Sequence, residues 1–247
     1  KLVLGTQCGG SDALSGITAN PAIGYVSDFV VENGGTVLLT EVAEMIGTEN
    51  ILAERARTPA VADKIRRIIE AEELEVRKYL GPEASRIIAR GNIAGGLTTI
   101  QEKALGCIRK GGRSQITDVL EYGEAIGGRK GLVIMRGPGY DPVSLTGLFS
   151  TGAQVLFYST GRGNPLGYPA APCIKICSNS KTYYAMGGDG GDMDINAGAV
   201  ITEGLSPEAL GKRCVDFLLE VCNGRETVPE KHGLGGALCV FSASTPL

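Results

Sequence analysis

The sequence lacks the features by which nucleic-acid-binding and membrane proteins are usually recognised. Its formal net charge is −3 over 247 residues, so it offers no basic field to a phosphate backbone, and we expect no nucleic-acid partner. No apolar run approaches the roughly 20 residues that a membrane-spanning helix needs, and no charged-then-apolar signal segment is present, so we expect no membrane association. The first residue is not Met, which is typical of a fragment boundary.

A disulfide framework is also missing. The seven cysteines are odd in number and spread along the chain, which predicts reduced thiols in a cytoplasmic protein. Cys173 and Cys177 have three residues between them in a strand-like pattern and do not have the two-residue gap of a zinc knuckle. Cys107, Cys214 and Cys222 fall at apolar positions of predicted helices, where core packing is expected.

Apolar runs of strand length alternate with segments of helical periodicity. The predicted strands cover 2–6, 36–40, 132–136, 155–159 and 173–177, and their continuous apolar composition is typical of a parallel sheet covered on both faces. The predicted helices cover 21–33, 60–80, 98–110 and 206–222. A last apolar run, 237–241, is predicted as an edge strand.

This alternation predicts an α/β fold with a doubly wound, mainly parallel sheet and helices on both faces, a variant of the Rossmann arrangement. The length suits one α/β domain over 1–247, within which 41–130 is a helix-rich excursion from the sheet. The carboxyl ends of the five strands should then meet at one crevice, where such folds bind their ligands.

The first strand is followed by a turn that combines three reactive groups. Cys8, Ser11 and Asp12 lie within five residues and flank two glycines, ahead of a helix. A thiol, a hydroxyl and a carboxylate at the end of a parallel strand can bind a ligand together. A glycine turn with a buried cysteine and an Asp helix cap explains the same residues equally well.

Five long motifs carry a family resemblance. In chain order they are QCGGSDALSGITANPAIG (7–24), GGLTTIQEKALG (95–106), GPGYDPVSLTG (137–147), STGRGNPLG (159–167) and DMDINAG (192–198). Together they resemble the altronate/galactarate dehydratase family, and the matches run from the first residues to about His232. Members of this family are longer, so the chain resembles their C-terminal portion.

The resemblance implies a lyase that eliminates water from a sugar acid or aldarate, and a related branch eliminates sulfite from sulfolactate. It implies a divalent metal, usually iron, with Mn²⁺, Mg²⁺ or Ca²⁺ as alternatives. The expected partners are a small sugar acid, the N-terminal domain of the same enzyme and possible further copies of the chain in a homo-oligomer. Such an elimination needs metal ligands, carboxylate anchors and a base.

The metal-ligand candidates come from three places. The acidic pair Asp192 and Asp194 follows a glycine-rich turn, and a solvated acidic turn is its alternative explanation. Glu41 and Glu44 follow the second strand, where an exposed pair favoured by a helix dipole is equally consistent. Cys8 and Asp12 in the first turn complete the set. A thiol ligand suits iron, whereas an all-oxygen site suits magnesium or calcium.

The substrate-binding candidates lie on turns after strands. Arg162 and Asn164 follow the fourth strand, and an Arg on such a turn can hold a carboxylate in bidentate fashion or bond loop carbonyls. Asn179 follows the fifth strand, and Ser11 lies in the first turn. Asp141 ends the third strand in a similar way, but a helix N-cap explains it at least as well.

Three residues are candidate acids or bases. His232 is the sole histidine and the natural choice near neutral pH, although an exposed histidine without a role is also consistent. Glu102 and Lys103 begin a helix beside a glycine pair and could equally form a surface pair. A nucleotide-binding module and a non-catalytic remnant are the competing functions, but no P-loop or G-x-G-x-x-G pattern supports the former.

Overall fold

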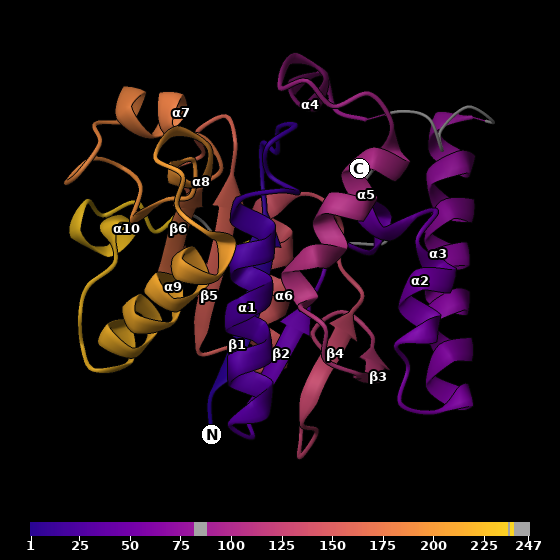
Figure 1. The fold of residues 1–247 in the computed structure, drawn as a ribbon. Helices are drawn as coiled ribbons and strands as arrows, with labels where there is room; N and C mark the ends of the chain where they lie inside the picture. Colours follow the sequence, from indigo (N-terminus) through magenta and orange to yellow (C-terminus); the bar gives the residue numbers. More distant parts are fainter. Residues whose placement is uncertain (82–87, 237, 240–247) are drawn as a thin grey trace.

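One parallel sheet organises the protein. The computed structural model describes residues 1–81, 88–236 and 238–239. In these residues the sheet order is β3 (Ile116–Leu120), β4 (Gly131–Met135), β2 (Thr36–Leu39), β1 (Val3–Cys8), β5 (Val155–Thr160), β6 (Cys173–Cys177) and β7 (Ile195–Asn196), as Figure 1 shows in part. All neighbouring strands are parallel. The predicted α/β class with a mainly parallel sheet is confirmed.

Helices connect the strands and cover both faces of the sheet. They are α1 (Ala19–Glu32), α2 (Glu49–Glu54), α3 (Pro59–Leu80), α4 (Arg90–Ala94), α5 (Ile100–Cys107), α6 (Asp141–Thr151), α7 (Ser180–Ala185), α8 (Ala199–Thr202), α9 (Pro207–Cys222) and α10 (Val228–Lys231), with the 3₁₀ helices η1 (Val42–Met45) and η3 (Ile108–Gly111). Among the described residues, no helix combines the length and the apolar character that crossing a membrane requires.

The predicted helix starts follow from their capping residues. The Thr58 side chain accepts a hydrogen bond from the backbone N–H of Val61 at the start of α3, and Ser206 does the same for Ala209 in α9. The predicted helix over 98–110 is α5, and its last turn tightens into η3. On α9, Cys214 is buried as predicted, but Cys222 is exposed at the last residue of the helix, so its predicted core role is wrong.

Two strands of the sheet were not predicted. β3 is a half-exposed edge strand with the sequence ITDVL, and β7 has only two residues, so neither forms a continuous apolar run. Because β3 lies within 41–130, this helix-rich segment also contributes a strand to the sheet. Residues 237, 240 and 241 of the predicted edge strand over 237–241 lie outside the described part, and residues 238 and 239 are not in a strand.

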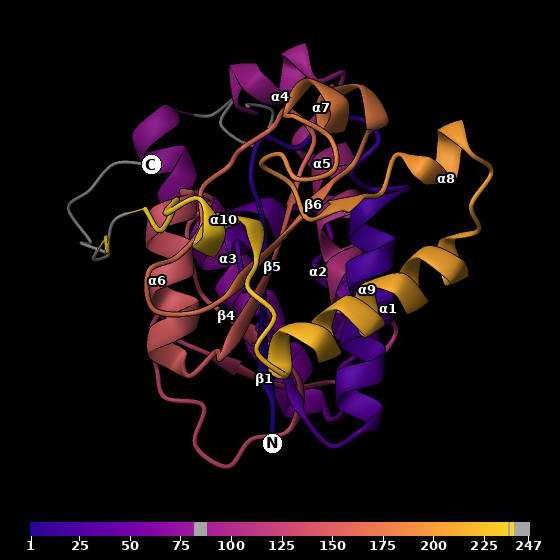
Figure 2. The same cartoon turned by 90° about the vertical axis from the view of Figure 1, so that its left-hand side faces the viewer.

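The sheet separates two hydrophobic cores. Consecutive side chains of a strand point to opposite faces, so Leu39 packs in the core with α1, α3 and α9, whereas Leu38 packs in the core with α6. Figure 2 shows α6 on one side of the sheet and α1 with α9 on the other. This two-faced covering is the doubly wound arrangement expected from the sequence.

Close glycine contacts fix α5 and η3 against the first turn and α1. A Cβ added to Gly16 would lie 2.8 Å from the Cα of Gly106, and one added to Gly24 would lie 2.3 Å from the carbonyl oxygen of Arg109. The Ser27 hydroxyl donates a hydrogen bond of 2.6 Å to the carbonyl oxygen of Lys110. Only glycine permits these approaches, and they determine where the side chains of α5 and η3 point.

The contact at Gly24 gives a prediction about stability. Gly24→Ala should lower the free energy of unfolding by about 1–3 kcal/mol, because the added methyl group would clash with the backbone of η3 and force it to move. Gly128→Ala is the matched control, since a Cβ there meets nothing within 4 Å. Urea denaturation of both variants tests this, and equal stability of the two would contradict the packing described here.

Candidate functional site

The site lies where the strand order reverses. β1 is flanked by β2, which the chain reaches through α1 on one face, and by β5, which it reaches through α6 on the other. Open α/β sheets bind ligands outside the carboxyl ends of the strands at such a point. β1 ends at Cys8, β2 is followed by Glu41, and β5 ends at Thr160.

Four side chains with metal-ligating atoms gather at this edge of the sheet. They are Cys8, Glu41, Glu44 and Cys107; one ligand atom from each lies within 4.8 Å of those of the others, and all four residues are buried. The Cys8 thiol donates to Glu44 Oε2 at 3.2 Å and lies 3.3 Å from Glu41 Oε2. We call these residues the thiol–carboxylate cluster. It unites three of the ligand candidates from the sequence and adds Cys107.

Two lysines balance the charge of the two carboxylates. Lys110 Nζ donates to Glu41, and both side chains are 0% exposed. Lys103 Nζ donates to Glu44 and, at 3.1 Å, to Asn92 Oδ1. A buried charge without a partner is very costly, so each carboxylate depends on its lysine.

The surroundings set the protonation of the cluster. A hydrogen bond to Cys107 and burial raise the pKa of the Cys8 thiol well above its usual value, which favours the protonated thiol over the thiolate. Burial alone would raise the pKa of Glu44, but the charges of Lys103 and Lys110 outweigh it and lower that pKa. Burial alone would likewise lower the pKa of Lys110, but the sulfur and carboxyl groups around it hold the pKa well above its usual value.

Glu41 has an unusual backbone conformation. Its φ of 71° and ψ of 55° are left-handed, and no other non-glycine residue in the described ranges has a positive φ. This conformation costs on the order of 1 kcal/mol and is enriched at functional sites. Burial raises the pKa of the Glu41 carboxyl, but three donors oppose burial: Lys110, the Gln7 amide at 2.9 Å and the Cys8 backbone N–H at 3.0 Å. We therefore assign it as a carboxylate.

A buried hydrogen-bond network continues from Glu41 toward α6. The Gln7 amide nitrogen also donates to Asp141 Oδ1 at 3.1 Å, and its oxygen accepts from the Ser144 hydroxyl at 2.6 Å. The Asn164 amide donates to Asp141 Oδ2 at 3.0 Å. Asp141 is the first residue of α6 and Tyr140 is its N-cap, so the N-cap explanation for Asp141 is wrong. The network joins Asn164, predicted to bind substrate, to the cluster.

Lys175 of β6 lies on the face of the sheet that α6 covers. Its side chain is fully buried, its Nζ lies 2.9 Å from the ring centroid of Tyr158, and it donates to the Leu166 carbonyl at 2.9 Å. Burial lowers the pKa of Lys175 to about 7, although Cys173, Asp141 and Asp194 oppose the shift. The ammonium form is therefore poorly stabilised at neutral pH.

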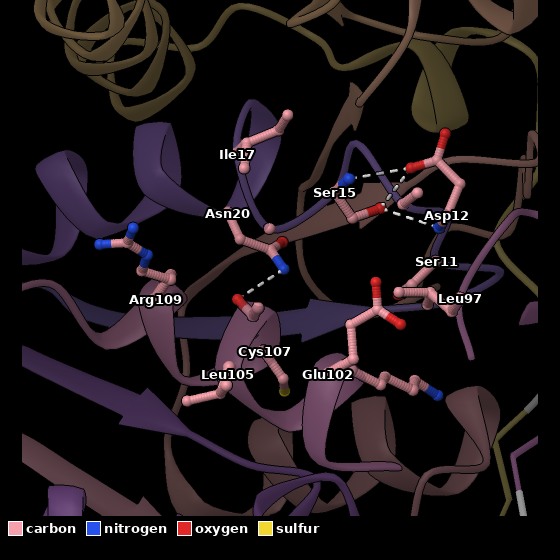
Figure 3. A pocket seen from close by; sticks show the side chains of 14 residues that line it. Ser11, Asp12, Ser15, Ile17, Asn20, Leu97, Glu102, Leu105, Cys107 and Arg109 are labelled. Atoms are coloured by element: carbon pink, nitrogen blue, oxygen red, sulfur yellow. Dashed lines mark hydrogen bonds between the residues drawn. The ribbon is translucent and has the colours of Figure 1, made fainter. Parts of the chain in front are cut away.

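A cavity adjoins the cluster. It measures about 270 Å³ and opens between the β1–α1 turn and α5, as Figure 3 shows. Cys107 and Lys103 line it on the α5 side, and Ser11 and Asp12 line it on the other. The cavity therefore lies next to one edge of the buried cluster.

Asp12 and Asn179 hold loops together. Asp12 Oδ1 accepts from the Ser15 hydroxyl at 2.8 Å and the Ser178 hydroxyl at 2.6 Å, and Oδ2 accepts from the Asn179 amide at 2.8 Å. Asn179 is also the N-cap of α7. Asp12 therefore joins the turn after β1 to the turn after β6 and is not in the thiol–carboxylate cluster. The Ser11 carbonyl accepts from the Asn92 amide at 2.9 Å.

The remaining candidates lie outside the cluster. Asp194 accepts from the backbone N–H groups of Lys175 and Val228, and Asp192 lies 3.1 Å from Nδ1 of the exposed His232. Glu102 accepts from Thr98 and is exposed. Arg162 is exposed on the turn after β5, and a Cβ on Gly91 would lie 2.7 Å from its Nη1.

Sequence reasoning missed three residues around the cluster. Cys107 was assigned to core packing, while Lys110 and Gln7 were not singled out. Cys107 is the last residue of α5, and Lys110 follows three residues later in η3. A lysine among apolar helix positions was the available signal, because buried lysines usually have a charged partner.

Comparison with known proteins assigns nearly the whole chain to one family. Residues 1–244 match the family described as D-galactarate/Altronate dehydratase, C-terminal. The chain is 36% identical over 247 residues to an altronate dehydratase of Bacillus subtilis and 38% identical over 250 residues to a galactarate dehydratase (L-threo-forming) of Escherichia coli. It is 32% identical over 235 residues to a (2R)-sulfolactate sulfo-lyase subunit beta of Chromohalobacter salexigens.

These alignments cover 100%, 98% and 94% of this chain but 48%, 46% and 59% of the three relatives. The chain therefore spans about half the length of the two dehydratases that it matches.

The buried pair of Glu41 and Lys110 gives a second prediction. Lys110→Met should lower the free energy of unfolding by about 3–5 kcal/mol, because it leaves a buried carboxylate unpaired. The double variant Glu41→Gln/Lys110→Met should lose less than the sum of the two single variants, measured by urea denaturation in metal-free buffer. Lys64→Met breaks a half-exposed ion pair with Asp118 and should cost less than about 1 kcal/mol. Additive single effects would contradict the pairing.

Lys175 gives a third prediction. Its folded pKa of about 7 lies below the unfolded value of about 10.4, so between these pH values the unfolded chain binds more protons and the stability supplied by this group rises with pH. The stability of Lys175→Met relative to the wild type should therefore be highest near pH 7 and decline by on the order of 4 kcal/mol toward pH 10. Exposed Lys181→Met is the control, and a difference that does not vary with pH would contradict this result.

Proposed function

The chain belongs to the family of C-terminal domains of D-galactarate and altronate dehydratases, and we propose that it forms the C-terminal half of a metal-dependent hydro-lyase. The proposed substrate is a sugar acid or aldarate such as altronate or galactarate. The observation that supports this most is the thiol–carboxylate cluster, which lies at the switch point of the sheet, has a charge-balancing lysine on each carboxylate and borders a cavity.

The cluster fits a divalent cation by its donor chemistry. Cys8, Glu41 and Glu44 offer one sulfur and two carboxylate oxygens at one point, and such a mixed set accepts a borderline metal such as Fe²⁺. Each carboxylate is also oriented by outer hydrogen bonds, as metal-binding carboxylates usually are. We restrict the proposal to these residues, because Asp12 and Asp194 use their oxygens in other hydrogen bonds.

The protein residues have distinct roles in the proposed elimination. A bound divalent metal supplies a Lewis acid that stabilises the negative charge developing on a substrate carboxylate. Glu44 holds Lys103 as an ammonium by raising its pKa, against the effect of burial. Lys103 lines the cavity and is protonated there, so we assign it to donate a proton to the departing hydroxide. We assign Arg162 to a substrate carboxylate, since its guanidinium can bind both oxygens.

The active enzyme is proposed to require a second segment. The dehydratase relatives are about twice as long as this chain, and the sulfo-lyase relative is named a subunit. A segment equivalent to the other half of the dehydratases, in the same chain or a separate one, would complete the enzyme. A sulfolactate sulfo-lyase is the second candidate, because the alignment with that subunit covers 94% of this chain.

The fourth prediction tests the reaction in the full-length protein. Incubation with altronate or galactarate should yield a 2-keto-3-deoxy acid, and chelation should abolish this until Fe²⁺ is restored. Lys103→Met should lower kcat by roughly 10²–10⁴-fold, as expected for loss of a general acid. Release of sulfite from (2R)-sulfolactate, without dehydration of either sugar acid, would favour the second candidate.

Exposed Lys212 on α9 provides a control, and Lys212→Met should leave kcat unchanged. Arg162→Ala should mainly raise KM, because it removes a contact that the substrate makes before and during the reaction. Full activity after thorough chelation would exclude the metal-dependent reaction.

A further inference from the structure

We propose that Cys107 is the second thiolate ligand of the metal, so that the site consists of two thiolates and two carboxylates and selects a thiophilic divalent ion. The inference rests on the proposed metal dependence and adds both a ligand and a class of metal to it. In this class are Fe²⁺, Co²⁺ and Zn²⁺, whereas Mg²⁺ and Ca²⁺ prefer sites made of oxygen alone.

The position of Cys107 is unlike that of a core cysteine. It is 1% exposed and ends α5, and its sulfur lies within 4.8 Å of the ligand atoms of Cys8, Glu41 and Glu44. Cys214, by contrast, is buried among the apolar side chains of α9. A core cysteine contributes to stability by burying its apolar surface among other apolar side chains, and two carboxylates with two ammonium groups do not provide such surroundings. The surroundings of Cys107 instead suit a ligand.

The backbone around α5 holds Cys107 in place. The carbonyl oxygen of neighbouring Gly106 accepts from the Asn20 amide at 3.0 Å, and Asn20 Oδ1 accepts from the Ser159 hydroxyl at 2.7 Å. Gly106 also packs directly on Gly16. The end of α5 is thus fixed to the turn that follows Cys8 and to β5, which pairs with β1 at Cys8, so both sulfurs are positioned by the same elements.

Charge neutrality supports two thiolates. The carboxylates of Glu41 and Glu44 and the ammonium groups of Lys103 and Lys110 cancel one another in two ion pairs. Two cysteines that bind as thiolates, with their protons released to solvent, would add two negative charges, and a divalent ion would cancel both. A site with two thiolates is therefore neutral with its metal bound, which avoids the large cost of a net buried charge.

The cavity lies beside these ligands, since Cys107 and Lys103 are among the residues that line it. The lysines remain hydrogen-bonded to the carboxylates, where they act as outer partners of the ligands.

Cobalt binding tests the assignment, because sulfur–Co²⁺ charge-transfer absorption in the near ultraviolet grows with each thiolate bound. Metal-free full-length protein is titrated with Co²⁺ alone. Cys107→Ala should lose about half of the absorption per bound ion. Its Kd for Co²⁺ should rise by more than the roughly 10–100-fold that loss of an outer partner causes. Cys214→Ala, the matched buried-thiol control, should behave as the wild type.

X-ray absorption of the Co²⁺- or Zn²⁺-loaded wild type gives a result that depends on no variant. Two sulfur neighbours are expected at about 2.3 Å. One sulfur or none, unchanged cobalt absorption in Cys107→Ala, or displacement of Co²⁺ by an equal concentration of Mg²⁺ or Ca²⁺ would overturn the proposal. Two sulfurs in a protein without lyase activity would refute the proposed function alone, whereas an active, metal-dependent enzyme with one sulfur would refute only the role of Cys107.

Discussion

Two carboxylates buried at the end of a parallel sheet require positive charge beside them, and the local architecture follows from that requirement. Glu41 and Glu44 come directly after β2, but their lysines lie 69 and 59 residues later in the chain. The segment between must therefore return to the same edge of the sheet. α5 and η3 bring both lysines there, and α5 also brings Cys107.

The turn after β1 serves the fold and the site together. It follows directly on Cys8, the last residue of β1 and a member of the thiol–carboxylate cluster, and through Gly16 it provides the surface on which α5 packs. Asp12 in the same turn binds Ser178 and Asn179 after β6. A single turn thus contacts two other parts of the chain, and the cavity lies between this turn and α5. This arrangement explains why so many of its residues are small or polar.

The hydrogen bonds of Gln7 connect residues on the two sides of the sheet. Its amide joins Glu41, which pairs with Lys110 of η3, to Asp141 at the start of α6. Asp141 in turn accepts from Asn164 on the turn after β5. The left-handed backbone of Glu41 is held in place by this network and by Lys110. Strain at one residue is therefore balanced by contacts from several elements.

The sequence by itself determined the class of fold, most of the sheet and the family. Continuous apolar runs specify buried parallel strands locally, and capping residues specify where α3 and α9 begin. The edge strand β3 was not predicted, because its half-exposed sequence ITDVL has no continuous apolar run. The sequence also identified Cys8, Glu41 and Glu44, since residues directly after parallel strands share one edge of the sheet.

Only the tertiary structure decided which candidates meet. Asp12 and Asp194 have the residue type of a ligand, but their oxygens are used in hydrogen bonds to loops and backbone. Cys107 and Lys110 have helical positions that resemble those of core residues, yet packing of α5 and η3 on α1 directs both toward Glu41. Contacts between residues so far apart in sequence depend on how the helices pack against the sheet. Hydrophobic periodicity predicts the helices and strands themselves but not which of their side chains meet.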